Sequence, residues 1–354
     1  MSTPQPTYWH RLISGQARGV TPALARAGLS AAAAVYSGVV RLRNGLYDFG
    51  VFRARRLPVP VISIGNLTVG GTGKTPFVEL VCRKLRELGR RPAILTRGYK
   101  AGAHGSDEAG LLAERLPDVP VVVNPDRVAG GREAISARGA DVLVLDDGFQ
   151  HRRLARDLDI VLVDAVNPFG YGAVLPAGLL REPPSGLARA HLVVRTRCPV
   201  DDPVGLRHPG RPFPDVPVLR CRHSPTDFLL HDGDGPPAAE PVESLRARGL
   251  FAFCGLADPA AFVRSLRDWG CQVRGERHFP DHHAFTADDV AALAAARPFG
   301  TTAVTTEKDF QRLLWLPADV RRALHPLAVV RIRMEILSGE RDLDRALRSV
   351  LPQS

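Results

Sequence analysis

The sequence has little of what builds disulfide-rich, zinc-binding or nucleic-acid-binding proteins. Its five cysteines are scattered over 354 residues, and no two of them form a Cys-x-x-Cys pair. That spacing argues against a disulfide framework or a zinc knuckle and is typical of reduced thiols in a cytosolic protein. Aromatic residues make up only 6% of the chain, which disfavours the stacking platforms that bind single-stranded nucleic acid. With 45% hydrophobic residues, no low-complexity segment and no internal repeat, the composition predicts a globular chain of two or more domains.

Long hydrophobic runs are also missing. The longest, at residues 29–40, is 12 residues long, whereas a membrane-spanning helix needs roughly 20. The cleavage context of a signal peptide is absent too, because basic residues continue after the apolar run. Between residues 24 and 49 apolar residues recur every three or four positions, which predicts an amphipathic helix. Its apolar stripe consists of Leu24, Gly28, Ala31, Val35, Val39, Leu42, Leu46 and Phe49.

Positive charge is concentrated at the N-terminus. The chain carries a formal net charge of +10, and residues 1–56 hold eight arginines but only one acidic residue, Asp48. A basic segment beside an apolar helix face favours a helix that lies on an anionic lipid surface rather than across the bilayer. From the pattern alone, a helix packed on the protein's own core is the alternative.

Residues 61–75 combine an apolar strand, a glycine-rich turn and the start of a helix. The turn consists of Thr68, Val69, Gly70, Gly71, Thr72, Gly73, Lys74 and Thr75. In such a turn the backbone N–H groups bind phosphate, the lysine reaches the β- and γ-phosphates, and the hydroxyl that follows binds Mg²⁺. The strict pattern has glycine in place of Thr68, and Gly70 and Gly71 compensate for it. We therefore predict a nucleotide site; a flexible turn before a helix is the alternative.

From residue 57 to about 200, strand-like and helix-like segments alternate. The predicted strands are 59–65, 92–97, 120–123, 141–146, 159–164 and 191–196, and the predicted helices are 75–88, 107–116 and 127–138. This alternation predicts an α/β domain with a mostly parallel sheet covered on both faces. Ligands bind such sheets at the carboxyl ends of the strands, so motifs at strand ends carry the most weight.

Acidic residues follow one of these strands. The strand at 141–146 ends in Asp146 and Asp147, and Gly-Phe-Gln-His comes next. A carboxylate at a strand end beside a phosphate loop commonly binds Mg²⁺, and two adjacent aspartates repel each other without a cation. A solvated Asp-Asp-Gly turn is the alternative. Farther along, Arg181 and Glu182 precede a proline, and from residue types alone we expect a surface ion pair there.

A stretch rich in Pro and Asp near residues 200–220 is interpreted as a linker. The second α/β unit after it has predicted strands at 249–255, 272–279, 302–306 and 327–334, and predicted helices at 259–269 and 288–296. The predicted organisation is an N-terminal membrane-associating segment (1–56), a core domain (57–215) and a smaller C-terminal domain (216–354).

Asp281, His282 and His283 lie between two elements of that second unit. An aspartate beside a histidine can serve proton transfer. The triplet can also bind metal, as in the Asp-His-His phosphoesterases, although those need further aspartate motifs and have no phosphate loop. A structural role is the default for either histidine alone.

Taken in order, these motifs resemble the tetraacyldisaccharide 4′-kinases, the lipid A 4′-kinases of Gram-negative bacteria, from about residue 10 to 335. The resemblance rests on the phosphate loop with Asn66 before it, Thr-Arg-Gly-Tyr at 96–99, Asp107-Glu108, Asp-Asp-Gly-Phe-Gln-His at 146–151, Leu-Arg-Glu-Pro at 180–183, Phe-Pro-Asp-His-His at 279–283 and Thr-Thr-Glu-Lys-Asp at 305–309. Thr68 follows the family's own pattern. The chain departs from that pattern at 254–259, where isoleucine and asparagine are expected.

The resemblance implies a phosphate-loop core domain joined to a smaller α/β domain by a two-stranded link. It implies a kinase that uses ATP and Mg²⁺ to phosphorylate the 4′-hydroxyl of a tetraacylated glucosamine disaccharide 1-phosphate, giving lipid IVA. It also implies a monotopic enzyme on the cytoplasmic face of the bacterial inner membrane. The implied partners are the lipid substrate and an anionic lipid surface, with no nucleic acid and no obligate protein partner.

Residue roles are implied as well. Asp107 and His282 would assist deprotonation of the acceptor hydroxyl, and Lys74 would serve the transferred phosphate. The residues implied around the Mg²⁺-nucleotide are Thr75, Asp146, Asp147 and Glu182. Those implied near the disaccharide or the transferred phosphate are Asn66, Gln150, His151 and Arg181.

Two other function classes compete with the kinase. A nucleotide-dependent switch often carries lysine just before the two glycines, where this chain has Val69. A guanine-binding protein needs an Asn-Lys-x-Asp motif near a strand end, and the sequence has no such motif. A nucleic-acid-binding ATPase is disfavoured because the excess positive charge is N-terminal and aromatic residues are few.

Overall fold

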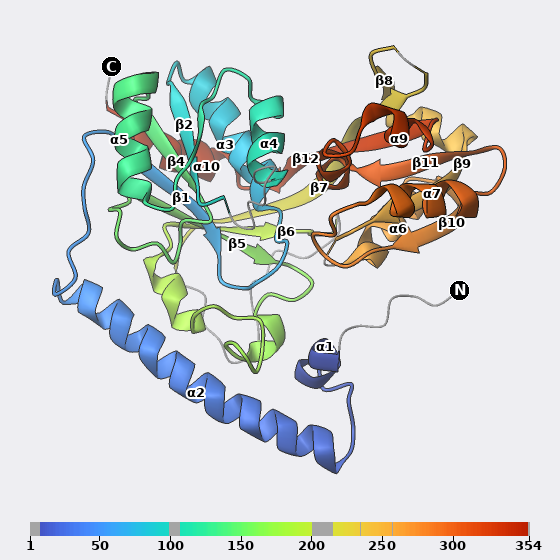
Figure 1. Ribbon diagram of the computed structural model, residues 1–354. Helices are drawn as coiled ribbons and strands as arrows, with labels where there is room; N and C mark the ends of the chain where they lie inside the picture. The colour runs from blue at the N-terminus through green and yellow to red at the C-terminus, as the bar shows by residue number, and fades with distance from the viewer. Residues whose placement is uncertain (1–7, 99–106, 200–214, 234, 257, 353–354) are drawn as a thin grey trace. The chain divides into compact units, whose positions relative to one another are not determined.

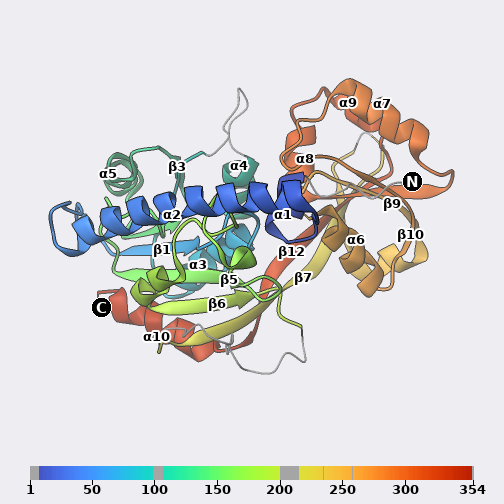
Figure 2. The same ribbon diagram turned by 90° about the horizontal axis from the view of Figure 1, so that it is seen from below.

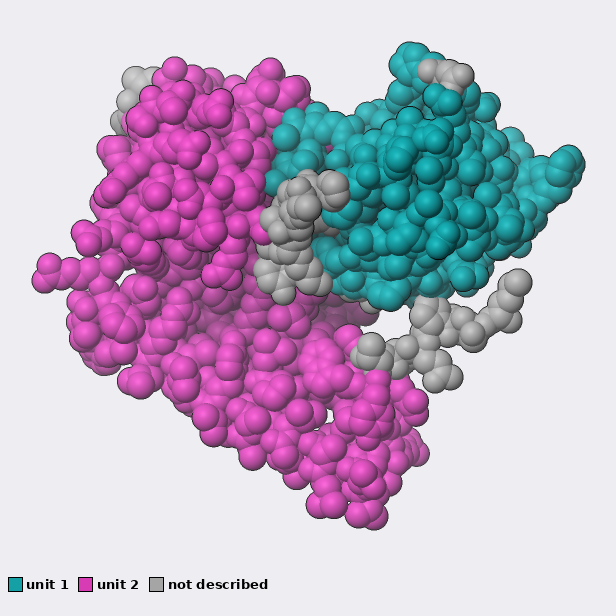
Figure 3. Space-filling view, viewed as in Figure 1, with its two compact units in different colours: residues 1–4, 100–114, 224–333 teal, residues 5–99, 115–223, 334–354 magenta. Residues whose placement is uncertain are grey.

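The computed structural model describes residues 8–98, 107–199, 215–233, 235–256 and 258–352, with the side chain of residue 107 outside the description. It comprises two compact units, coloured separately in Figure 3. The core unit consists of residues 5–99, 115–223 and 334–354, and the second unit of residues 1–4, 100–114 and 224–333. This division differs from a single boundary near residue 216, because residues 334–354 belong with the core unit.

The sheet of the core unit is built around β1 (Val61–Asn66), the strand that leads into the phosphate loop. The strand order is β3-β2-β4-β1-β5-β6-β7, and all these neighbouring pairs are parallel. The other strands are β2 (Pro92–Thr96), β3 (Val121–Val123), β4 (Val142–Asp146), β5 (Leu158–Asp164), β6 (Leu192–Thr196) and β7 (Val218–His231). Apart from β3 and β7 these strands are buried along their whole length, as expected of a sheet covered on both faces. The predicted α/β fold and its first six strands are confirmed.

Helices α3 (Lys74–Glu87), α5 (Arg127–Arg138) and α10 (Glu340–Val350) belong to the core unit (Figure 1). The carboxylate of Asp126 caps α5 by accepting from two backbone N–H groups of its first turn, and Gly139 ends the helix in the left-handed conformation. Its buried residues pack on β1, β2 and β4 in one apolar cluster. Two 3-10 helices, at Gly170–Gly172 and Pro184–Arg189, lie between β5 and β6.

The N-terminal segment forms α1 (Tyr8–Ile13) and α2 (Val20–Asp48). Helix α2 runs along the segment between β5 and β6, drawn yellow-green in Figures 1 and 2. Ala33 of α2 is buried in an apolar cluster with residues of that segment. The predicted apolar stripe faces outward instead, with Val35 71% and Phe49 87% exposed. The alternative in which this stripe packs on the protein's own core is therefore wrong.

By length and composition α2 is also able to cross a membrane, since it has 29 residues, a mean hydropathy of 1.4 over its apolar window and only 6% of that window buried. Its other face, however, makes polar contacts with the core unit. The Tyr36 hydroxyl donates to the Arg181 carbonyl (2.8 Å), and the Arg43 guanidinium donates to the Gln150 carbonyl (2.8 Å). These contacts attach one face of α2 to the core unit.

The second unit contains a sheet of order β10-β9-β11-β12, with parallel neighbours. Its strands are β8 (Ala238–Pro241), which pairs with β7, and β9 (Gly249–Cys254), β10 (Gln272–His278), β11 (Thr301–Thr306) and β12 (Leu327–Ser338). Its helices are α4 (Asp107–Arg115, of which Arg115 belongs to the core unit), α6 (Pro259–Asp268), α7 (Ala287–Ala296), α8 (Glu307–Leu313) and α9 (Ala318–Arg322), with a 3-10 helix at Val242–Ala247. The predicted strands and helices of this part are confirmed.

Two long strands contribute residues to both units. β7 passes from the core unit to the second unit after His223, and β12 returns to the core unit at Met334. The linker expected at 200–220 is therefore a strand from Val218 onward, and its part at 200–214 lies outside the described residues. Because β12 leads into α10, the C-terminus returns to the core unit, where the Lys84 ammonium pairs with Glu340 (2.7 Å) and Asp344 (2.9 Å).

Candidate active site

The phosphate loop connects β1 to α3 in the centre of the parallel sheet. β1 ends at Asn66 and α3 begins at Lys74, so the glycine-rich turn leads directly into a helix N-terminus. Gly73 precedes the helix with φ of +82°, a conformation that favours glycine. The Thr75 side chain lies in the first turn and is buried. Free N–H groups of a first helical turn bind anions, so the loop has the form of a phosphate site.

Lys74 points into this loop. Its ammonium group lies 3.3 Å from Asn66 Oδ1 and 3.6 Å from Asp147 Oδ1, and its side chain is only 13% exposed. A lysine directed at bulk solvent would contradict a nucleotide site. The Lys74 side chain is instead mostly buried in the loop, as a nucleotide site requires.

The two aspartates at the end of β4 differ in their surroundings. Asp146 is buried and pairs in the sheet with Ile64 of β1. Asp147 has a positive φ of 56°, and its carboxylate accepts from the Arg181 guanidinium at 2.7 Å. Burial raises the pKa of Asp147, but the charges of Lys74 and Arg181 outweigh it and hold the pKa below the ordinary value. A solvated Asp-Asp-Gly turn is excluded by the burial of Asp146.

The segment containing Arg181 and Glu182 pairs with the phosphate loop. The Val69 amide donates to the Leu179 carbonyl (2.8 Å), and the Arg181 amide donates to the Leu67 carbonyl (2.7 Å). The expected surface ion pair between Arg181 and Glu182 is therefore wrong. Arg181 reaches Asp147, whereas Glu182 is 1% exposed and points elsewhere. Residue types alone did not reveal this antiparallel pairing.

Glu182 is a buried carboxylate with three donors. It accepts from Arg189 (2.7 Å), from the Gln150 amide (2.9 Å) and from the Asn44 amide of α2 (3.2 Å). Gln150 also donates to the Asn66 carbonyl at the end of β1 (2.9 Å). A buried charged group costs much less free energy when it is paired and hydrogen-bonded, as this one is. The cluster thus ties α2, the strand β1 and the 179–183 segment together beside the loop.

His151 lies among arginines. Burial, and then the charges of Arg127 and three other arginines, lower its pKa to about 4. The imidazole is therefore neutral at physiological pH. Burial also lowers the pKa of Arg127 to about 10, while Asp146 and Asp147 act in the opposite direction. Spacing in the sequence gave no indication of Arg127, because a single arginine at a helix start is common.

The second unit places His282 in a fixed position. Its φ of 60° is unusual for a residue other than glycine, and its amide donates to the Gly255 carbonyl (3.2 Å). The Arg312 guanidinium contacts His282 Nδ1 at 3.3 Å, and the Asp281 carboxylate lies 3.9 Å from Nε2. Strained backbone that the surrounding structure holds in place is common at functional sites.

The contacts of His283 are those of a histidine with a structural role, which is the default expectation for a single histidine. Its Nε2 lies 2.9 Å from the Asp289 carboxylate at the start of α7, and its ring stacks on Phe279. Among the described residues there is no group of three His, Cys, Asp or Glu side chains placed to hold a metal. A two-metal site built on the Asp281–His283 triplet is therefore not supported.

Asp107 is the first residue of α4, and its side chain lies outside the described part of the chain. The next residue, Glu108, accepts from Lys308 of α8 at 2.6 Å. Gln311 of α8 likewise donates to Glu114 of α4. Because Arg312, which contacts His282, is also on α8, the same helix holds both α4 and the His282 turn within this unit.

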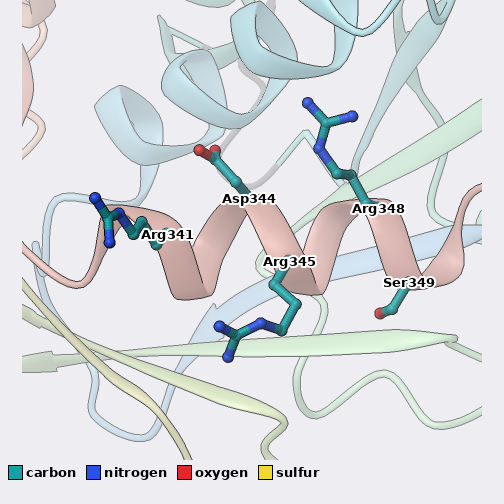
Figure 4. A pocket seen from close by; sticks show the side chains of 5 residues that line it. All are labelled: Arg341, Asp344, Arg345, Arg348 and Ser349. Carbon is teal, nitrogen blue, oxygen red and sulfur yellow. The ribbon is translucent and has the colours of Figure 1, made fainter.

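A surface hollow of about 490 Å³ lies beside α10 (Figure 4). It is lined by Arg341, Asp344, Arg345, Arg348 and Ser349. None of these is a predicted site residue. Lys74, Asp147 and Arg181 lie together at the phosphate loop instead.

A phosphate loop whose lysine is held between Asn66 and Asp147, with a buried glutamate beside it, is the arrangement of a nucleotide-dependent enzyme. Over residues 25–352 the chain matches the family described as tetraacyldisaccharide-1-P 4′-kinase. The chain belongs to this family. Membership makes it a kinase of lipid A biosynthesis with a phosphate-loop core.

Named relatives support the tetraacyldisaccharide-1-P 4′-kinase family across the whole chain. A tetraacyldisaccharide 4′-kinase of Anaeromyxobacter sp. (strain Fw109-5) is 44% identical and covers 99% of this chain and 97% of its own. One from Pelobacter propionicus is 40% identical and covers 99% of both. The crystal structure of LpxK from Aquifex aeolicus in complex with ATP has a TM-score of 0.70 and 30% identity, covering 92% of this chain and 99% of the other.

Several residues that contact or lie close to the predicted site residues within each unit were missed by sequence reasoning. They are Tyr36, Asn44, Arg127, Arg189 and Arg312. Tyr36 and Asn44 could have been suspected from the sequence, because they are polar residues that lie off the apolar stripe of a predicted amphipathic helix. The others act through contacts between elements far apart in the chain.

Proposed function

We propose that this kinase transfers the γ-phosphoryl group of ATP to the 4′-hydroxyl of tetraacyldisaccharide 1-phosphate. The acceptor oxygen bonds to the γ-phosphorus, the bond from that phosphorus to the departing ADP breaks, and the hydroxyl proton passes to a base. The observation that carries the proposal is the phosphate loop with Lys74 directed into it beside Asn66 and Asp147, in a chain of this family. Phosphoryl transfer depends mainly on positioning and charge neutralisation, which such a loop supplies.

Buried polar atoms around the loop fit a nucleotide and Mg²⁺. Within the described residues, Asn66 Nδ2, Thr72 Oγ1 and Gln150 Oε1 are buried without a hydrogen-bond partner, although most buried polar atoms have one. Thr75 and Asp146 offer the oxygen ligands that Mg²⁺ takes from proteins, usually one or two beside the phosphates. When bound, Mg²⁺ would neutralise phosphate charge.

Asp147 and Glu182 are proposed to support this site in a different way from Thr75 and Asp146. Their carboxylates are already paired with Arg181 and Arg189, respectively. They would therefore orient those arginines and neighbouring groups, with any contact to the ion made through water. Arg181, Gln150 and His151 remain proposed to bind the acceptor or the transferred phosphate.

Asp107 and His282 are proposed to handle the proton of the acceptor hydroxyl. A sugar hydroxyl is a weak acid, and a positioned base contributes about 10²- to 10⁴-fold in rate. The connections of α4 and the His282 turn to α8 support this pairing of residues that are 175 positions apart in the sequence.

The exposed face of α2 is proposed to lie on the cytoplasmic surface of the inner membrane. The proposed acceptor carries four acyl chains and stays in a bilayer, so the enzyme must reach it there. Arginines that lie off the exposed apolar stripe of α2 fit an anionic lipid surface.

The test is phosphate incorporation by the purified full-length protein. Mixed micelles of tetraacyldisaccharide 1-phosphate and detergent are supplied with ATP and Mg²⁺, and labelled lipid and free ADP are both measured. The kinase should release ADP only when the acceptor is present, whereas a nucleotide-dependent switch would hydrolyse ATP slowly without it. Asp107→Ala and His282→Asn should lower kcat with little change in the KM for ATP. Asp268→Ala, an exposed carboxylate at the end of α6, is the matched control and should behave as wild type.

A further inference from the structure

Arg312 is almost entirely buried and cannot change its position easily. It is 2% exposed, and its partner Asp309 is fully buried. One guanidinium nitrogen donates to the Asp309 carboxylate (2.9 Å) and to the Gly255 carbonyl (3.0 Å). Asp309 is fixed in turn by the Gly255 amide (3.0 Å) and the Thr306 hydroxyl (2.7 Å). The guanidinium is therefore a rigid donor in a closed network.

The second guanidinium nitrogen of Arg312 is directed at His282 Nδ1, at 3.3 Å. An arginine has only donors, so this contact is a hydrogen bond only if Nδ1 is the acceptor. In a neutral imidazole one ring nitrogen accepts and the other carries the proton. The proton of His282 is therefore on Nε2, which faces the Asp281 carboxylate at 3.9 Å. Arg312 and Asp281 are thus two charged groups that face this ring.

The backbone holds His282 against the same network. Its amide donates to the Gly255 carbonyl that Arg312 also contacts, and its φ is 60°. Gly255 leaves room for this packing, since a Cβ there would lie 3.0 Å from the Pro280 carbonyl and 3.3 Å from Asp309 Oδ1. The turn and the guanidinium thus share one anchor point.

We propose that Arg312 is a positioning residue that fixes His282 as the neutral tautomer protonated on Nε2. This inference rests on the proposed function for its consequence in the reaction. With Nδ1 occupied by Arg312 and Nε2 protonated, His282 donates a hydrogen bond from Nε2 and has no free lone pair. The proton released by the acceptor hydroxyl then goes to the carboxylate of Asp107, and His282 orients that carboxylate or the acceptor.

The direct test is the ¹⁵N NMR spectrum of the full-length protein labelled on histidine, in micelles. Among the 11 histidines, the His282 signals are identified by their loss in His282→Asn, since asparagine tolerates a positive φ. The proposal expects an unprotonated Nδ1 and a protonated Nε2 in the wild type. A proton on Nδ1 of His282 overturns it, whether or not the protein shows kinase activity.

The kinetic test uses Arg312→Lys, which keeps the positive charge but loses the planar fork of donors. We expect kcat to fall at least about tenfold, an unchanged KM for ATP, and a His282 spectrum of mixed tautomers. Arg297→Lys is the control: Arg297 also donates to two backbone carbonyls in this unit, those of Leu324 and His325, but contacts no site residue. Wild-type kcat and an unchanged His282 spectrum in Arg312→Lys would refute the role. If Arg312→Lys does not fold, as judged by circular dichroism, the wild-type spectrum decides.

The proposed function and the proposed tautomer of His282 can be overturned separately. Absence of phosphate transfer to the lipid disaccharide by the wild type overturns the proposed function, and the spectrum still decides the tautomer. Transfer by a wild type whose His282 carries its proton on Nδ1 supports the proposed function and overturns this inference.

Discussion

The side-chain amide of Asn44 on α2 donates a hydrogen bond to the carboxylate of Glu182, with 3.2 Å between Nδ2 and Oε2. The helix that exposes its apolar face thus contacts a buried acid beside the phosphate loop through its other face. Two further hydrogen bonds also join α2 to this region: Tyr36 donates to the Arg181 carbonyl, and Arg43 donates to the Gln150 carbonyl. The proposed membrane surface and the candidate active site share one helix.

Replacing Asn44 with alanine should weaken the site without releasing the protein from membranes. A hydrogen bond to a charged group contributes about 1.5–3 kcal/mol, and this one is long and partly exposed, so we expect a loss of about 1 kcal/mol in unfolding free energy and a decrease of a few fold in kcat. Chemical denaturation and initial rates measure the two effects. Arg41→Ala, an exposed residue of the same helix, is the control. Equal effects of both substitutions would contradict a specific role for the Asn44–Glu182 contact.

A negative charge on the exposed face of α2 should weaken membrane binding. Val39 is 60% exposed in the middle of the apolar stripe, and burying a valine in lipid contributes about 1.5 kcal/mol or more. Val39→Asp removes that term and adds repulsion from anionic lipid, so binding to phosphatidylglycerol vesicles should fall at least about tenfold. Val123→Asp places the same charge on an exposed strand residue of the core unit and should leave sedimentation unchanged. Vesicle binding retained by Val39→Asp would show that another surface contacts the membrane.

Asp147 should stabilise the fold only where it is ionised. Its pKa is below the ordinary carboxyl value because Lys74 and Arg181 outweigh burial. A lowered folded-state pKa gives stability that is present above the unfolded-state pKa and lost as pH falls through the folded one. Asp147→Asn should therefore be less stable than wild type at neutral pH, and the difference in denaturation midpoint should shrink below about pH 4. A difference that is independent of pH would indicate packing rather than charge.

His151 should also make stability rise with pH, but across a higher pH range than Asp147. Its pKa is lowered to about 4, chiefly by burial and then by Arg127, against about 6.5 in an unfolded chain. Between these values the unfolded state binds a proton that the folded state does not, so stability rises with pH across that window. His151→Gln removes this term, and its stability relative to wild type should increase as the pH falls from 6.5 to 4. A titration of His151 near its ordinary pKa, followed by NMR, would exclude this explanation.

The strands, the phosphate loop and most helices were predictable because their signals are local. The loop has its lysine and glycines in sequence, and the helix at residues 127–138 starts after a capping aspartate and ends before a glycine. The apolar stripe of α2 was equally predictable, although the surface that the stripe faces was not. A periodic pattern identifies the apolar face but does not say whether protein, lipid or water covers it.

Contacts between distant segments were not predictable. Arg181 and Glu182 looked like a surface pair, because neither residue type shows that the 179–181 backbone pairs with the phosphate loop. Likewise, the motif ending at Asp309 suggested function, but Arg312, three residues later, becomes significant only when the short helix α8 folds against the Gly255 turn. The return of β12 and α10 to the core unit was equally hidden, because Lys84 pairs with Glu340 and Asp344 across 256 and 260 positions of the sequence.

Gly73 and Gly71 offer a paired test of the phosphate loop. At Gly73 the φ is +82°, and a Cβ would lie 2.5 Å from His223 Nε2 and 3.0 Å from the Met334 methyl group, whereas a Cβ at Gly71 would meet nothing within 4 Å. Gly73→Ala therefore combines a strained backbone with a clash against the two long strands. It should lower ATP affinity at least about tenfold and unfold at a lower temperature, since such strain costs roughly 1–3 kcal/mol. Gly71→Ala should unfold at the wild-type temperature. Adding His223→Ala to Gly73→Ala removes the 2.5 Å contact but not the backbone strain, so the double variant should recover only part of the lost unfolding temperature. Full recovery would mean that contact with His223, and not the backbone conformation, is what requires glycine at this position.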